Sequence, residues 1–272
     1  MQAHRLPARH GLFWLAGGFL LYRRNPPLLS MLTFANMLLA LMCSLLQPFG
    51  PFLLVLGSPL IIALIANACA AIAEYGPLQL SPLMLLRGLR EHARLLLRLG
   101  VVQMACLILV TLLVDAVLPD IDPAALLKPG SPGQPPVLPD TRQLGTLLLH
   151  LILVALAVLP AFWFAPLLTA WHGINPVKSV FFSLIAVWRN WRAFLVYVLA
   201  AGTLVLLIPA LLMALFSLLP GFLGSLLSTA VQLLTLLMLA PILATGAYCS
   251  YREIIVRHDG NDPRRGEPRA IA

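Results

Sequence analysis

The chain has 272 residues, of which 60% are hydrophobic and only 10% are charged, and its mean hydropathy is +0.93. A soluble globular domain averages about 45–50% apolar and about 25% charged residues. The composition therefore excludes an ordinary soluble protein and indicates a membrane protein. The net charge of +8 raises the question of nucleic-acid binding, but the basic residues flank apolar runs, where membrane topology places them. We expect no nucleic-acid partner.

Residues 1–26 form a basic arm around one short apolar run. This run, Gly11 to Leu21, is too short to cross a bilayer, which takes about 20 residues. No small-residue cleavage site follows it, as a signal peptide would require. We predict a cytoplasmic interfacial helix whose Trp14 lies at the depth of the lipid headgroups.

Six apolar runs are long enough to span a membrane. They cover residues 27–46, 52–73, 99–118, 144–171, 194–219 and 222–248. The sequence thus predicts an all-α integral membrane protein with six transmembrane helices, arranged as three tandem hairpins that each follow a cytoplasmic amphipathic helix. The predicted division is an arm (1–26), a hairpin (27–73), a basic segment (74–98), a hairpin (99–171), a second basic segment (172–193), a hairpin (194–250) and a polar tail (251–272).

The second hairpin contains a long polar loop, residues 119–143. Seven prolines fall within it, and such a composition builds no core. We place this loop on the outer side of the membrane. Sixteen of the eighteen Lys and Arg residues lie in the arm, the two basic segments and the tail. With six spans these regions share one side, so the positive-inside rule puts both termini in the cytoplasm of a bacterial inner membrane.

The two basic segments are candidate sites for anionic lipids. On a helix, four arginines before the third span share one face, and leucines occupy the opposite face: Arg87, Arg90, Arg94 and Arg98. In the second segment, Lys178, Arg189 and Arg192 lie opposite an apolar face of Val180, Leu184, Val187 and Trp191. Each basic side chain near an anionic leaflet gains about 1 kcal/mol. The alternative is that these residues only fix the topology.

The three hairpins share a sequence pattern. Each return span carries a small residue and then a proline, at Pro59, Pro166 and Pro241. A proline frees a backbone carbonyl inside a helix, and such breaks either line binding sites in transporters or kink helices for packing. Tandem repetition of one unit is our interpretation of the pattern, and packing is the favoured role of the prolines.

Asp115 and His150 are the pair of side chains best suited to proton chemistry. They fall near the outer ends of the third and fourth spans, so they could meet as a proton relay or a pH sensor. The alternative is an interfacial pair without a function of its own. No motif of a known metal, nucleotide or hydrolase site occurs, and the four cysteines all sit in apolar runs,. We expect no cofactor, no metal and no enzymatic activity.

Two stretches of the chain carry a resemblance. They are Leu6-Pro7-Ala8-Arg9-His10-Gly11 with Arg23-Arg24-Asn25-Pro26, and Phe164-Ala165-Pro166-Leu167 with Trp171-His172-Gly173 and Trp188-Arg189-Asn190-Trp191-Arg192-Ala193-Phe194. Together they resemble an uncharacterised family of proteobacterial six-span inner-membrane proteins. The resemblance implies a bacterial polytopic membrane protein and brings no known activity. The chain is also similar in general character to membrane domains attached to glycerophosphodiester phosphodiesterases, which implies a link to lipids.

The favoured hypothesis is a non-enzymatic protein that acts at the cytoplasmic leaflet, through anionic lipids, envelope maintenance or partner membrane proteins, with a homo-oligomer left open. The alternative is a small-molecule or lipid transporter, or a transporter subunit, built from three repeats.

Overall fold

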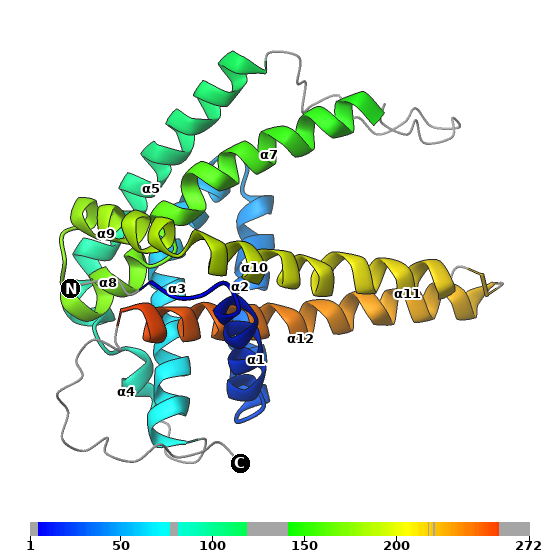
Figure 1. Ribbon diagram of the computed structural model, residues 1–272, viewed down its shortest axis with the longest axis horizontal. Coiled ribbons are helices and arrows are strands. Elements are labelled where there is room, and N and C mark those ends of the chain that lie inside the picture. The colour runs from blue at the N-terminus through cyan, green and yellow to red at the C-terminus, as the bar shows by residue number, and fades with distance from the viewer. Residues whose placement is uncertain (1–4, 77–80, 119–140, 217, 220, 256–272) are drawn as a thin grey trace.

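The structure is a computed structural model, and it describes residues 5–76, 81–118, 141–216, 218–219 and 221–255. All regular structure in these ranges is helical (Figure 1). In chain order the elements are α1 (His10–Tyr22), α2 (Pro26–Leu45), α3 (Phe49–Tyr75), α4 (Pro82–Leu85), α5 (Leu89–Val117), α7 (Thr141–Phe162), α8 (Ala165–His172), α9 (Pro176–Arg189), α10 (Trp191–Gly202), the π-helical η1 (Thr203–Leu207), α11 (Ile208–Phe216) and α12 (Phe222–Ile254). The predicted Pro-rich loop and polar tail lie mostly outside the described residues.

Six helical stretches in the described residues are long and apolar enough to cross a membrane, which confirms the predicted number. They run over Pro26–Leu45, Phe49–Tyr75, Pro82–Val117, Gly145–His172, Trp191–Phe216 and Phe222–Ile254. Consecutive spans pack together: α2 contacts α3, α5 contacts α7, and α11 runs beside α12 (Figure 1). Large aliphatic side chains remain exposed along these helices, for example Leu112, Leu151 and Leu211. Such surface belongs in lipid hydrocarbon.

The region before the third span differs from the prediction. The sequence suggested one helix that carries four arginines on a single face, but α4 ends at Leu85 and α5 begins only at Leu89. Between them, Gly88 has φ +70°, a left-handed conformation that glycine adopts without steric cost. The backbone bends again at His92, whose φ of −111° and ψ of 16° are not helical. Arg87 therefore lies outside the helix that carries Arg90, and the predicted four-arginine face is wrong.

The buried core lies where the short helices meet the ends of the long ones. Trp14 of α1, Phe164 beside α8, Val187 of α9, Phe194 of α10 and Tyr251 of α12 all belong to one cluster of buried side chains. In Figure 1, α1 crosses the pair formed by α10 and α12, and α8 and α9 lie at the same end of the molecule. The short helices thus join the long ones into one unit.

Helix α1 packs against protein rather than projecting its tryptophan into lipid. Trp14 is 1% exposed, and its indole N–H donates to Glu253 Oε2 over 2.6 Å. Gly11 lies directly against the backbone of α10 at Ala193, and a Cβ on Gly18 would come within 2.7 Å of the Gly246 nitrogen of α12. The two glycines let α1 approach both helices closely. The side chain of Trp14 therefore contacts protein, while its depth in the membrane stays a prediction.

Candidate functional site

A pocket of about 320 Å³ opens at the elbow between α9 and α10. We call it the elbow pocket, and its lining is Arg5, Leu6, Trp188, Arg189, Asn190, Trp191 and Arg192. Three of these seven residues are arginines and none is acidic. The lining thus joins the N-terminal arm to a turn some 185 residues later in the chain,.

The elbow exists because α9 stops at Arg189 and α10 starts at Trp191. Asn190 lies between them, is 2% exposed, and donates from Nδ2 to the carbonyl of Ala186 over 2.9 Å. Its Oδ1 accepts the backbone N–H of Leu6 over 2.8 Å. One buried amide therefore stabilises the end of α9 and holds the arm against the elbow. This contact keeps Arg5, next to Leu6, at the pocket.

Two exposed tryptophans flank the arginines. Trp188 is 76% exposed and Trp191 is 54% exposed. The guanidinium of Arg192 lies 5.5 Å from the centre of the Trp191 ring, close enough for a cation–π interaction. Tryptophan is enriched at membrane–water interfaces because its ring is apolar and its N–H is polar. The pocket thus combines three positive charges with an aromatic rim typical of headgroup depth.

Helix α9 has a pattern opposite to that of a soluble amphipathic helix. Its buried positions are small or polar, namely Ser179, Ser183 and Ala186, with Val187 beside them. Its exposed positions are mostly large and apolar: Val177, Phe181, Phe182, Leu184, Ile185 and Trp188. Small polar side chains face protein and large apolar ones face outward, so the outward side of α9 suits an apolar environment. The predicted apolar face is split, because Val187 is buried while Leu184 and Trp191 are exposed.

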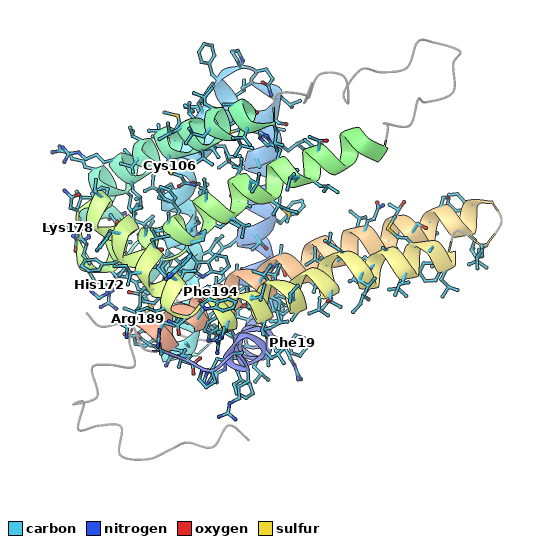
Figure 2. The ribbon with its side chains drawn as sticks, turned by 45° about the horizontal axis from the view of Figure 1, so that its top comes forward. Phe19, Cys106, His172, Lys178, Arg189 and Phe194 are labelled. Atoms are coloured by element: carbon cyan, nitrogen blue, oxygen red, sulfur yellow. The ribbon has the colours of Figure 1, made fainter. Side chains whose placement is uncertain are left out.

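The predicted basic residues of this region do not form one cluster. Arg189 and Arg192 both line the elbow pocket. Lys178 is near the start of α9, eleven residues before Arg189, which is roughly 16 Å along a helix. Figure 2 shows the two labelled residues well apart. Trp191 and Arg192 belong to α10 and not to the preceding helix, which corrects the prediction of a single segment.

The arginines before the third span are exposed, as are Lys178, Arg189 and Arg192. The described lining of the elbow pocket does not include Arg87, Arg90, Arg94 or Arg98. Arg87 instead contributes a backbone contact to the packing of α3. Its carbonyl and that of Leu85 accept hydrogen bonds of 2.8 Å from the Asn67 side chain. Asn67 also accepts from the indole of Trp171 over 2.6 Å. These contacts connect the segment after α3 to α8.

Asp115, near the end of α5, and His150, in the middle of α7, do meet. Asp115 Oδ1 lies 3.4 Å from His150 Nδ1, and the two side chains are 52% and 14% exposed. The Nδ1 atom is itself buried and has no hydrogen-bond partner with good geometry. The contact is therefore an ion pair when the imidazole carries a proton, and otherwise a loose polar contact. No group of three or more His, Cys, Asp or Glu able to hold a metal ion occurs in the described part of the chain.

Two of the prolines each leave a backbone carbonyl without its helical N–H partner, and a serine hydroxyl lies close to each of these carbonyls. Pro59 lies inside α3 and Pro241 lies inside α12, so each removes the N–H that would bond the carbonyl four residues earlier. The Ser58 hydroxyl lies 2.9 Å from the freed carbonyl of Val55. The hydroxyl of Ser30 reaches the freed carbonyl of Leu237 at 3.5 Å, the long limit for such a bond.

The fourth span is broken rather than kinked. Pro160 lies within α7, the helix ends at Phe162, and Pro166 sits in the first turn of α8. Ser183 of α9 bridges the break, because its hydroxyl accepts the N–H of Phe164 over 2.9 Å and donates to the carbonyl of Pro160 over 2.9 Å. One turn away, Thr169 bonds Ser179 over 3.0 Å. The polar face of α9 thus satisfies the backbone groups that the break exposes.

One curated protein shows what this chain is related to. Over 208 residues, 33% are identical to a "Probable inner membrane protein" of Burkholderia thailandensis, and the match covers 72% of this chain and 74% of the relative. The chain belongs to the same family as this probable inner-membrane protein. With its six membrane-length helices, it is a multi-pass inner-membrane protein. No family model matches the chain, and no solved structure does.

Sequence reasoning missed two parts of the pocket. Arg5 was counted only as one charge of the basic arm, because nothing in its local sequence indicates that it meets a turn near residue 190. Asn190 had a detectable signal, since a short amide residue between two apolar helical runs is a common helix boundary. The contact between Asn190 and Leu6 depends on tertiary packing and has no signature in the local sequence.

Proposed function

We propose that this protein is a non-enzymatic inner-membrane protein that acts at the cytoplasmic leaflet, where the elbow pocket binds the headgroup of an anionic phospholipid. The observation that carries the proposal is the pocket itself, with three arginines, no acidic lining residue and an aromatic rim. Arginine is suited to phosphate because its planar guanidinium can donate two parallel hydrogen bonds. The negative charge of the cytoplasmic leaflet adds about 1 kcal/mol of attraction for each basic side chain.

The surroundings of the pocket support this position in the membrane. Helix α9 exposes Phe181, Ile185 and Trp188 outward, and the pocket lies at its end. In the proposed topology α9 lies in the interface, its apolar side enters the acyl chains, and the pocket faces the headgroups. Both termini are cytoplasmic in this topology, by the charge count along the chain,. The three tandem hairpins, each preceded by an interfacial helix, are part of the same proposal.

Native mass spectrometry tests this function. The purified wild type is exchanged into equal amounts of phosphatidylglycerol and phosphatidylcholine, and retained lipid is compared with that of R189Q/R192Q. The matched control is R23Q/R24Q, which removes the same charge from exposed positions outside the pocket. We expect phosphatidylglycerol on the wild type and the control, and its loss from R189Q/R192Q. Equal retention by all three proteins would contradict the proposal.

The transporter alternative finds less support. Broken spans line binding sites in transporters when the freed backbone groups face a cavity. In this protein, the hydroxyls of Ser58 and Ser183 lie within 2.9 Å of the carbonyls of Val55 and Pro160. Internal satisfaction of this kind favours packing as the role of the prolines.

A further inference from the structure

The elbow pocket is assembled from two parts of the chain that no local sequence connects. Arg189 and Arg192 belong to the elbow, whereas Arg5 and Leu6 belong to the N-terminal arm. The arm reaches the elbow through the Leu6 N–H bond to Asn190. It continues into α1, which Glu253 holds through His10 Nδ1 at 2.7 Å and through the Trp14 indole. The third positive charge of the pocket is therefore present only when the arm is docked.

We propose that a phosphate-bearing anion bridges the arm and the elbow, so that its binding and the docking of the arm stabilise each other. This inference rests on the proposed function and adds to it a specific role for Arg5. The phosphate is the shared chemistry of two sources, a phospholipid headgroup and a soluble phosphate ester, and we assign it to the lipid because the pocket lies beside the outward apolar side of α9.

The physical basis of the coupling is charge. Three arginines line the pocket and its described lining includes no acidic residue, so their positive charges repel one another when the pocket is empty,. An anion between them removes that repulsion and adds charge-assisted hydrogen bonds to both parts of the site. A ligand that binds only the docked arrangement must favour that arrangement, and docking must raise its affinity by the same factor. Arg5 is exposed, so its side chain is free to complete the site without a change in the core.

Hydrogen–deuterium exchange of the full-length protein in nanodiscs tests the coupling. The signal is the exchange rate of the arm, and above all of the Leu6 amide that bonds Asn190. Nanodiscs contain phosphatidylcholine alone, phosphatidylcholine with phosphatidylglycerol, or phosphatidylcholine with added glycerol phosphate. The variant is R5Q, and the control is R9Q, which changes an exposed arm arginine outside the pocket.

We expect phosphatidylglycerol to slow arm exchange about tenfold in the wild type and in R9Q, the scale of one charge-assisted hydrogen bond. R5Q should show no slowing and should retain less phosphatidylglycerol. If R5Q behaves as the wild type while R189Q/R192Q loses the lipid, the bridge is wrong and the proposed function stands. If no variant alters lipid retention, the proposed function fails as well. Slowing by glycerol phosphate in phosphatidylcholine nanodiscs would overturn the assignment to lipid.

Discussion

The contact between α1 and α12 through Glu253 gives the sharpest test of the packing. Glu253 is 20% exposed at its side chain and accepts from the Trp14 indole N–H at 2.6 Å, while His10 Nδ1 lies 2.7 Å from its other oxygen. A hydrogen bond to a charged group contributes about 1.5–3 kcal/mol. Removal of the carboxylate by E253A also leaves the buried N–H of Trp14 without this acceptor.

We therefore expect E253A to lower the free energy of unfolding by about 2–4 kcal/mol. W14F removes the donor and keeps an aromatic ring, so the double variant W14F/E253A should be less destabilised than the sum of the two single variants. The coupling energy should be about 1.5–3 kcal/mol. Reversible unfolding in mixed micelles of increasing dodecyl sulfate content, followed by circular dichroism, measures all four proteins of the cycle.

The control for charge is E91A, since Glu91 is an exposed acid in the first turn of α5. Its removal should change the free energy of unfolding by less than about 0.5 kcal/mol, as at most exposed positions. Two results would refute the reasoning. One is additivity of W14F and E253A to within about 0.5 kcal/mol, and the other is an E253A protein as stable as E91A.

Three further predictions concern contacts within and between the helices. S183A should lower the unfolding free energy by about 1–3 kcal/mol, because it removes the hydroxyl that bonds two backbone groups at the break in the fourth span,; wild-type stability would contradict this role. G18A should destabilise by about 1–3 kcal/mol through a clash with α12, whereas G57A, whose added Cβ meets nothing within 4 Å, should stabilise by about 0.5–1 kcal/mol,; denaturation of both variants checks the contrast. D115N should lower the unfolding free energy by less than about 1 kcal/mol, because Asp115 is half exposed and lies 3.4 Å from His150,; a larger loss in the same denaturation assay would contradict this estimate.

The six spans could be predicted because membrane crossing depends on the local sequence. A run of about 20 apolar residues satisfies its own backbone hydrogen bonds as a helix, whatever its neighbours are. The observed stretches Pro26–Leu45 and Gly145–His172 accordingly begin and end within a residue or two of the predicted 27–46 and 144–171. The relative from Burkholderia thailandensis confirms that the chain belongs to a family of inner-membrane proteins.

The arrangement of the short helices could not be predicted in the same way. Helical periodicity placed Arg87 and Arg90 on one face, but Gly88 adopts a left-handed conformation between them, and periodicity carries no information across such a break. Tryptophan is typical of interfacial anchors, yet the indole of Trp14 has a half-buried protein partner in Glu253, 239 residues later in the chain. Contacts of this kind depend on which helices pack together, and local sequence patterns do not reveal that.

The elbow pocket also combines residues that local sequence patterns predict with residues that only tertiary packing brings together. Arg189 and Arg192 were predicted as lipid-binding candidates from their charge and their shared side of an ideal helix, and both line the pocket. Lys178 was grouped with them because it shares their side of an ideal helix, but it lies at the other end of α9 (Figure 2). Arg5 was missed because the arm meets the elbow only in the folded protein.

The central claim is that an anionic headgroup occupies the elbow pocket. The most direct measurement is a cryo-electron microscopy map of the protein in nanodiscs that contain phosphatidylglycerol and phosphatidylcholine. We predict density for a lipid phosphate among the guanidinium groups of Arg5, Arg189 and Arg192, with α9 at the level of the headgroups and its apolar side in the acyl chains. An empty pocket, or an elbow that lies outside the headgroup layer, would contradict the account.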